Sequence, residues 1–273
     1  MLSIIIVNFK NPALLRLCLK SLEQTLTPQL NYELLVVDVS SETETQNVVL
    51  EEFPKVKLLP FKDNVGYTKG VNAGINKSSG DYILILNPDV IPLKNSVEQL
   101  FNYMKENPNI GLAGPQLLNF DGSPQQSCFG FYNVISIIYR RIGYLPFKKR
   151  ALKKFLMAGE DLSVVRPVDW LMGSALMAQR KAINKTGLMD EKFFLYFSDV
   201  DWARRFWENG YKVVYYPLVK IYHYHRRTSK KNSWVIDLLI NRQSRQHIKD
   251  GLRYLKKYGF FKTKWQKENK FLF

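Results

Sequence analysis

The chain has 273 residues, of which 46% are hydrophobic and 14% aromatic, and it carries a formal net charge of +16. This composition predicts a folded protein of one or two domains and excludes a largely disordered chain. Two cysteines without metal-ligand spacing exclude a disulfide framework and a zinc site, and they favour a reducing, cytoplasmic location. No apolar run approaches the roughly 18–20 residues that span a bilayer, and the start, MLSIIIVNF, lacks the basic region of a signal peptide.

The positive charge is concentrated in two segments. Residues 226–273 hold 14 Lys and Arg against three acids, and residues 140–156 hold seven basic residues and no acid. Aromatic residues accompany the basic ones, a composition that suits an anionic membrane face or a polyprenyl diphosphate. Nucleic-acid binding is the competing interpretation, although no nucleic-acid motif occurs, and a solvated basic helix is the simplest one.

The first 120 residues alternate strand and helix patterns. Apolar runs predict strands at Ser3–Phe9, Glu33–Val39, Val56–Phe61, Tyr82–Leu86 and Gly111–Leu118. Helical patterns follow Asn11-Pro12 and cover Glu44–Phe53, Tyr67–Lys77 and Leu93–Glu106. This alternation predicts an α/β fold with a Rossmann-like, mostly parallel central sheet that binds ligands at the carboxyl ends of its strands.

After residue 120 the pattern is less regular. An apolar segment with small residues, a helix and two strands are expected, in this order, at Val168–Gln179, about Asp199 to Glu208, Tyr211–Tyr216 and Val219–Tyr224. A basic helical period then runs from Trp234 to Tyr258 and includes Ile248, Leu252 and Leu255. We therefore expect one domain at residues 1–230, divided near residue 120, and a basic amphipathic helical extension at residues 231–273.

Candidate binding residues lie at the predicted strand ends. Asp38 ends the second strand and Asp89 follows the fourth, in the motif N-P-D-V, although each could also be a solvated turn aspartate. A carboxylate fixed there suits a hard divalent cation. Residues 64–74, NVGYTKGVNAG, repeat glycine every four residues, which indicates close approach of a ligand or tight helix packing. They match neither a Walker loop nor G-x-G-x-x-G.

The stretch FFLYFSDVDWARR, residues 193–205, contains two aspartates among aromatic residues. Ser198 and Asp201 have the spacing of a helix capping box, and acids favour a helix start. Asp199 could alternatively be a catalytic carboxylate in a dry, aromatic pocket. Both interpretations can hold together, if Ser198 and Asp201 cap the helix while Asp199 points to an acceptor.

Taken in order, these motifs resemble the markers of family-2 inverting glycosyltransferases with the GT-A fold. The matching stretches, over about residues 2–230, are SIIIVNF, VVDVSS, N-x-G-x-x-x-G-x-N-x-G, LNPDV, VDWLMGSALM and GLMDEKFFLYFSDVDWARR. The N-P-D-V form and the stretch from Val168 to Arg205 are most similar to bacterial rhamnosyltransferases that use dTDP-L-rhamnose. The resemblance implies Mg²⁺ or Mn²⁺, a glycan or polyprenyl-diphosphate-linked acceptor, and a cytoplasmic enzyme at the inner face of the membrane that makes surface polysaccharide.

The resemblance also implies roles for matching residues. Asp199 corresponds to the general base, and Asp89 and His223 correspond to groups near the metal. The donor-binding positions are Val7, Asn8, Phe9, Asp38, Asn64, Gly66, Asn72, Asn87, Asp89 and Arg227. The acceptor-side positions are Trp170, Gly173, Asp190 and Arg205.

Three residues depart from the family pattern. Ser198 stands where the family usually has Glu before the base, Asn87 replaces the first aspartate of D-x-D, and Val39 replaces the commoner Asn after Asp38. Ser198 removes a like charge beside the base and leaves open an altered acceptor interaction. The alternatives are therefore another donor, such as UDP-galactose, or a non-catalytic protein that binds glycan or nucleic acid.

Overall fold

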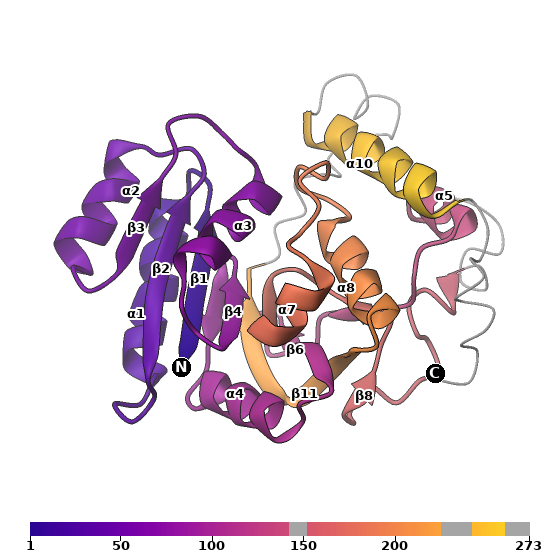
Figure 1. The fold of residues 1–273 in the computed structure, drawn as a ribbon, viewed down its shortest axis with the longest axis horizontal. Coiled ribbons are helices and arrows are strands. Elements are labelled where there is room, and N and C mark those ends of the chain that lie inside the picture. Colours follow the sequence, from indigo (N-terminus) through magenta and orange to yellow (C-terminus); the bar gives the residue numbers. More distant parts are fainter. Residues whose placement is uncertain (142–151, 225–241, 260–273) are drawn as a thin grey trace.

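The protein is described here from a computed structural model that covers residues 1–141, 152–224 and 242–259. A mixed sheet of nine strands forms its centre (Figure 1). In spatial order the strands are β3 (Lys57–Pro60), β2 (Tyr32–Asp38), β1 (Leu2–Asn8), β4 (Tyr82–Leu86), β10 (Ala175–Gln179), β6 (Ile110–Leu118), β11 (Lys212–His223) and β5 (Val90–Pro92), with β8 (Arg166–Pro167) paired to β11. The predicted α/β class is confirmed.

The strands β3, β2, β1 and β4 pair in parallel, so their carboxyl ends share one edge of the sheet. Asn8 lies opposite Asp38 in the register of β1 and β2, and Ile6 lies opposite Leu86 in the register of β1 and β4. The strand β10 runs antiparallel to both β4 and β6, while β6 and β11 are parallel. The topology therefore brings residues 8, 38 and 87–89 to the same edge, as the strand pattern predicts.

Helices cover both faces of the sheet. One core lies under α3 (Tyr67–Lys77), α7 (Arg180–Thr186) and α8 (Ser198–Glu208). The other lies under α1 (Pro12–Thr25), α4 (Ser96–Glu106) and the π-helical turn Val48–Glu52 that continues α2 (Thr43–Asn47). Alternate residues of β1 enter the two cores, which explains why this strand is apolar from Ile4 to Val7.

Two details of the predicted elements are wrong. The strands expected at Tyr211–Tyr216 and Val219–Tyr224 form the single strand β11, whose register against β6 shifts between Tyr216 and Lys220. Pro217 lies in this gap, and it cannot donate to the ladder, so the strand continues past an irregularity instead of ending. The helix expected from Leu93 begins at Ser96, because Val90–Pro92 pairs with β11.

Residues 121–224 and 242–259 build the side of the molecule that carries α8 (Figure 1). The short strands β7 (Cys128–Phe129) and β9 (Trp170–Leu171) form a second sheet, and α5 (Val134–Arg141) follows β7. In Figure 1, the helix α10 (Arg242–Tyr258) lies beside α5 and above α8. Among the described residues, no helix is both long and apolar enough to cross a bilayer.

The helix α10 confirms the described part of the helix predicted from Trp234 to Tyr258, but of the predicted apolar period it buries Leu255 and leaves Leu252 exposed. Leu252, part of the predicted apolar period, is 60% exposed. The buried residues are Ser244, Asp250, Gly251, Tyr254 and Leu255. Small side chains let the helix approach its neighbours closely, so packing and not hydrophobicity alone selects this face. The proposed domain boundaries at residues 120 and 230 stay a prediction.

Candidate active site

Two buried polar residues mark the carboxyl ends of β1 and β2. The Asn8 side chain donates from Nδ2 to Oδ1 of Asp38 at 3.0 Å, and both residues are fully buried. Burial raises the pKa of Asp38, although the hydrogen bond from Asn8 opposes this shift. Val7 points into the core, whereas Phe9 lies beyond the strand and is 47% exposed. Of these predicted donor-binding positions, Phe9 alone is largely open to solvent.

A second polar pair lies at the ends of β4 and β11. Nε2 of His223 lies 3.7 Å from Oδ1 of Asp89, and the Ser174 hydroxyl lies 3.1 Å from the same nitrogen. Burial raises the pKa of Asp89 to about 6. Among the residues that the structure describes, no group hydrogen-bonds to the buried Oδ1 of Asp89. A buried carboxylate oxygen without a donor, beside an imidazole nitrogen, is the arrangement expected where a cation binds.

Gln125 orients the imidazole of His223. Its Nε2 donates to the carbonyl oxygens of His223 at 2.8 Å and Leu118 at 3.3 Å, so its Oε1 faces His223 Nδ1 at 2.8 Å. Because Oε1 can only accept, Nδ1 carries the proton, and Nε2 presents its lone pair toward Asp89 and Ser174. Hydrogen bonding of this kind fixes the orientation of a metal-ligating histidine. No sequence motif marks Gln125, and sequence reasoning missed it.

The predicted base lies in the first turn of α8. Oδ2 of Asp199 accepts the backbone N–H of Gly173 at 3.2 Å, and the Tyr67 hydroxyl donates to the carbonyl of the same Gly173 at 2.8 Å. Burial raises the pKa of Tyr67, and the charges of Asp199 and Asp89 raise it further. The Tyr67 hydroxyl therefore lies near both carboxylates, although sequence reasoning gave it no role.

Gly173 and Ser174 connect the two halves of this site. Gly173 contacts Asp199 and Tyr67, while the next residue, Ser174, contacts His223 and accepts the backbone N–H of Asn87 at 3.0 Å. A two-residue stretch before β10 thus links the predicted base to the predicted metal site. The motif VDWLMGSALM contains both residues, so the sequence held a signal for Ser174.

Two acceptor-side candidates are held by internal contacts. Trp170 is buried, donates from Nε1 to the carbonyl of Gly130 at 2.9 Å and stacks on Phe129. Arg205 bonds Oδ2 of Asp201 at 2.9 Å, and its remaining nitrogens donate to carbonyls of residues 186–188. In this structure these side chains fix the surroundings of the site.

Asn72, Asn64 and Asp190 also make internal bonds. The Asn72 amide is bonded to the backbone of Met189 on both its oxygen and its nitrogen, which joins α3 to the segment before α8. Asn64 accepts the N–H of Gly66 at 2.9 Å, and Asp190 pairs with Lys257 at 2.8 Å. The donor- and acceptor-binding roles of these residues stay predictions, and Arg227 lies outside the described residues.

The glycine repeat serves helix packing at two of its three positions. A Cβ added to Gly70 would lie 2.5 Å from Cγ1 of Val39, and one added to Gly74 would lie 2.5 Å from Cγ2 of Ile5. These glycines therefore face the sheet, and they let α3 lie close to β1 and β2. Of the two interpretations of the repeat, tight helix packing holds for this face.

The capping-box prediction is wrong. The residue that caps α8 is Phe197, in the left-handed region at φ 64°, and its side chain makes no capping hydrogen bond. Within the first turn, Oδ1 of Asp199 accepts the N–H of Val200 at 2.9 Å. Ser198 lies one position too far along the chain, as the first helical residue. Asp201 is fully buried and pairs with Arg205 at 2.9 Å and with Lys257 at 2.7 Å. Asp201 thus stabilises the structure through ion pairs and does not cap the helix.

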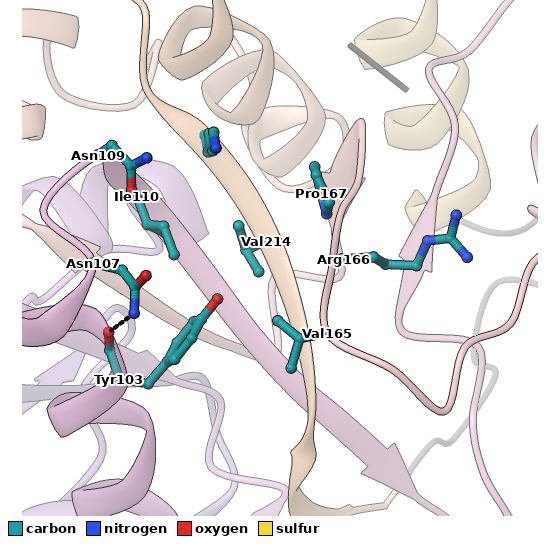
Figure 2. Close-up of a pocket in the computed structure, with 9 residues that line it drawn as sticks. Tyr103, Asn107, Asn109, Ile110, Val165, Arg166, Pro167 and Val214 are labelled. Atoms are coloured by element: carbon teal, nitrogen blue, oxygen red, sulfur yellow. Dashed lines mark hydrogen bonds between the residues drawn. The ribbon is translucent and has the colours of Figure 1, made fainter.

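A surface pocket lies elsewhere (Figure 2). Its volume is about 190 Å³, and it lies among α4, β6, β8 and β11, lined by residues that include Tyr103, Ile110, Arg166 and Lys212. Ile110 and Lys212 begin the strands whose other ends carry Leu118 and His223. This pocket is therefore at the opposite end of the sheet from Asp89 and Asp199, and it is not the candidate site.

The residues present fit the divalent cation that the family resemblance implies. Asp89 and His223 offer one carboxylate oxygen and one imidazole nitrogen, both buried and turned toward each other. Among the residues that the structure describes, no group of three or more His, Cys, Asp or Glu side chains could hold a metal ion. A cation at Asp89 and His223 would thus need further oxygen ligands from a substrate or from water.

Comparisons with known proteins identify the family of the chain. The sequence profile described as "Glycosyl transferase family 2" matches residues 3–155. The N-acetylglucosaminyl-diphospho-decaprenol L-rhamnosyltransferase of Mycobacterium tuberculosis is 30% identical over 203 residues, which are 70% of this chain and 66% of that protein. The dTDP-rhamnosyl transferase RfbF of Shigella flexneri is 25% identical over 209 residues, or 75% of this chain and 64% of that protein. The chain thus spans slightly less than two thirds of these relatives.

Solved structures share the fold. The mannosyltransferase PcManGT of Pyrobaculum calidifontis, solved with GDP-Man and Mn²⁺, aligns with a TM-score of 0.59 at 15% identity over 93% of this chain and 64% of that one. GalNAc-T7, solved with UDP, GalNAc and Mn²⁺, aligns with a TM-score of 0.67 at 16% identity over 98% of this chain and 57% of that one. The predicted GT-A fold is thereby confirmed, and the chain belongs to glycosyl transferase family 2.

Proposed function

We propose that the protein is an inverting glycosyltransferase that moves L-rhamnose from dTDP-L-rhamnose to a hydroxyl of a glycan or lipid-linked acceptor. The observation that carries this proposal is the link through Gly173 and Ser174, which holds Asp199 on one side and His223 with Asp89 on the other. Inverting transfer requires a base on one side of the anomeric carbon and a site for the leaving diphosphate on the other. We assign the first task to Asp199 and the second to Asp89 with His223.

Asp199 acts as the general base. Its Oδ2 is held by the Gly173 amide, and the residue is partly exposed at the start of α8, so it can take a proton from an acceptor hydroxyl. The positive end of the helix favours the ionised carboxylate, which is the form that accepts the proton. The hydroxyl oxygen then bonds to the anomeric carbon as the bond to the diphosphate oxygen breaks.

Asp89 and His223 hold the divalent cation, with Mn²⁺ or Mg²⁺ as the candidates. When bound, the cation supplies positive charge that offsets the negative charge of the leaving diphosphate. Gln125 keeps Nε2 of His223 turned toward the cation site, and Ser174 lies between this nitrogen and the base side. The Asn8–Asp38 pair at the neighbouring strand ends lies where the nucleobase is expected.

The choice of dTDP-rhamnose is supported by the N-P-D-V motif and by two relatives named as rhamnosyltransferases. A thermal-shift screen of nucleotide sugars, with and without Mn²⁺, tests this choice. A ligand at 100 times its Kd adds about 2.7 kcal/mol, which raises the Tm of a protein of this size by several degrees. We expect the largest shift with dTDP-rhamnose, dependent on Mn²⁺. A larger shift with UDP-galactose would indicate that UDP-galactose is the donor instead. No shift with any nucleotide sugar would favour a non-catalytic protein.

The outward face of α10 supports peripheral contact with an anionic membrane. Basic residues at helical spacing, with one leucine among them, are exposed on this face: Arg242, Arg245, Lys249, Leu252 and Lys256. These residues lie opposite the buried face, so the helix presents positive charge outward. A lipid-linked acceptor would then reach the enzyme at the side that carries α8.

Vesicle binding tests the membrane contact. Reversing the charge of Arg242, Lys249 and Lys256 should weaken sedimentation with phosphatidylglycerol vesicles, and added salt should weaken it for the wild type. A matched control reverses Lys55, Lys77 and Lys94, which are exposed elsewhere on the molecule. Equal loss in both variants would show a net-charge effect only, and binding to duplex DNA with equal strength would favour the nucleic-acid interpretation.

A further inference from the structure

The helix α10 carries a buried carboxylate to which the proposed mechanism gives no task. Asp250 is fully buried, and its Oδ2 accepts the backbone N–H groups of Leu195 at 3.3 Å and Tyr196 at 3.2 Å. Its Oδ1 accepts from Gln246 at 2.8 Å and Arg253 at 3.2 Å. A buried carboxylate is costly unless donors surround it, and here two of the donors are the backbone of another segment.

That backbone leads directly into the proposed base. Leu195 and Tyr196 precede Phe197, whose φ of 64° is uncommon for a residue other than glycine. Such a conformation costs free energy and persists only where the surroundings hold it. The carbonyl of Phe197 accepts the N–H of Asp201, so this turn sets the direction in which α8 begins.

The Phe197 side chain is itself held by α10. It is 4% exposed, and its ring centroid lies 5.5 Å from that of Tyr254. Gly251 faces the same ring, since a Cβ at this position would lie 3.2 Å from it. Glycine at this position therefore lets the helix backbone approach the turn.

A second anchor holds the other side of the base. Lys257 bonds Oδ2 of Asp190 at 2.8 Å and Oδ1 of Asp201 at 2.7 Å, and the Tyr258 hydroxyl donates to Oδ1 of Asp201 at 2.7 Å. The helix α10 thus contacts the chain before and after Asp199, and none of these bonds is made to Asp199 itself. Rigid support on both sides is what fixes the direction of a side chain in a short turn.

We propose that Asp250 is a positioning residue, which holds the Leu195–Phe197 turn so that Asp199 faces the acceptor hydroxyl. This inference rests on the proposed function, since it assigns Asp250 a task only if Asp199 is the base. A carboxylate misplaced by about 1 Å can cost on the order of 100-fold in rate. We expect the rate of the chemical step to fall and donor binding to stay unchanged, because Asp250 bonds neither Asp89 nor His223.

Two variants of the 273-residue chain test the proposal. Asp250→Ala removes the acceptor, and we expect kcat to fall roughly 10- to 100-fold while the KM for the nucleotide sugar stays within about twofold. Gly251→Ala adds a Cβ against Phe197, and we expect a smaller fall in kcat although alanine favours the helix by about 1 kcal/mol. If Asp250→Ala does not fold, Gly251→Ala decides the result.

The matched control is Glu33→Gln. Glu33 also accepts a backbone N–H across the fold, that of Ser79 at 2.6 Å, but it lies on β2 at the start of the strand, away from the carboxyl edge. Its loss should lower the Tm and leave kcat within about twofold. Hydrogen exchange supplies a readout besides activity: the amides of Leu195 and Tyr196 should lose protection in Asp250→Ala and keep it in the control.

Each outcome decides a separate point. The variants are compared with Glu33→Gln at an equal fall in Tm. If neither Asp250→Ala nor Gly251→Ala then has a lower kcat than Glu33→Gln, the positioning role is overturned. If the wild type transfers no sugar, the proposed function fails. Hydrogen exchange then tests the contact of Asp250 with the amides of Leu195 and Tyr196 by itself. If the protection of these amides is unchanged in Asp250→Ala, this contact is overturned as well.

Discussion

Replacing Gly66 by alanine should destabilise the protein through two separate effects. The residue precedes α3 at φ 82° and ψ 165°, a region that residues with a side chain rarely enter. An added Cβ would also lie 2.6 Å from two ring carbons of Phe194 and 2.8 Å from its carbonyl oxygen. The ring can move to some extent, whereas the carbonyl is held because it accepts the N–H of Tyr67 at 3.0 Å.

The magnitude follows from adding these effects. The backbone conformation costs about 1–3 kcal/mol, and the overpacking costs about the same again. Two further glycines separate the contributions. Gly122 has φ 81° and nothing within 4 Å of an added Cβ, so Gly122→Ala should lose only the backbone part. Gly74 is helical and its Cβ would meet Ile5, so Gly74→Ala should lose only the packing part, less about 1 kcal/mol of helix propensity.

Urea unfolding of the three variants measures the free energies. We expect Gly66→Ala to lose more stability than either Gly122→Ala or Gly74→Ala, and its loss to exceed their sum by about 1 kcal/mol, which is the helix propensity that Gly74→Ala gains. A loss for Gly66→Ala no greater than that for Gly122→Ala would show that the contact between the added Cβ and Phe194 has no energetic cost.

Three further predictions concern single side chains. Tyr67→Phe leaves the Gly173 carbonyl without its donor, so urea unfolding should show a loss of about 1–3 kcal/mol; an unchanged midpoint would contradict this. Asp89→Asn should weaken Mn²⁺ binding at least tenfold by calorimetry, because the buried anionic ligand is lost; equal Mn²⁺ affinity would show that Asp89 is not a ligand of the metal. Glu33 is partly buried, which raises its pKa, but bonds from Ser79, Lys57 and Ser3 outweigh burial and lower it to about 2. Glu33→Gln should therefore cost about 1 kcal/mol above pH 5, after discounting for solvent screening, and the difference from wild type should shrink as the pH falls from about 4.5 toward 2; a difference independent of pH would count against the charge.

Much of the fold could be predicted because apolar periodicity and sheet topology are local and regular. The middle residues of β1, β2 and β4 are apolar since helices cover both faces, and parallel pairing then brings residues 8, 38 and 89 to one edge. The helix start at Asn11-Pro12 is also correct, since the Asn11 side chain accepts the N–H of Leu14.

The missed features depend on contacts between distant segments. Gln125 matters because its amide meets His223, 98 positions away, and Asp250 matters because it meets Leu195, 55 positions away. Neither pairing leaves a period or a motif in the sequence. The prediction of the α8 cap was wrong for a related reason. Phe197 adopts a positive φ that the packing of α10 supports, so the helix begins one residue earlier than the Ser198 spacing suggests.

In the proposed reaction Asp199 deprotonates the acceptor, while other residues hold the donor. A transfer assay tests this by comparing wild type with Asp199→Asn, using labelled dTDP-L-rhamnose, Mn²⁺ and a bacterial lipid extract as acceptor. We expect the wild type to move label into the lipid-linked fraction, while Asp199→Asn keeps the thermal shift with dTDP and Mn²⁺ but loses transfer by at least 100-fold. Near-normal transfer by Asp199→Asn would show that Asp199 is not the base.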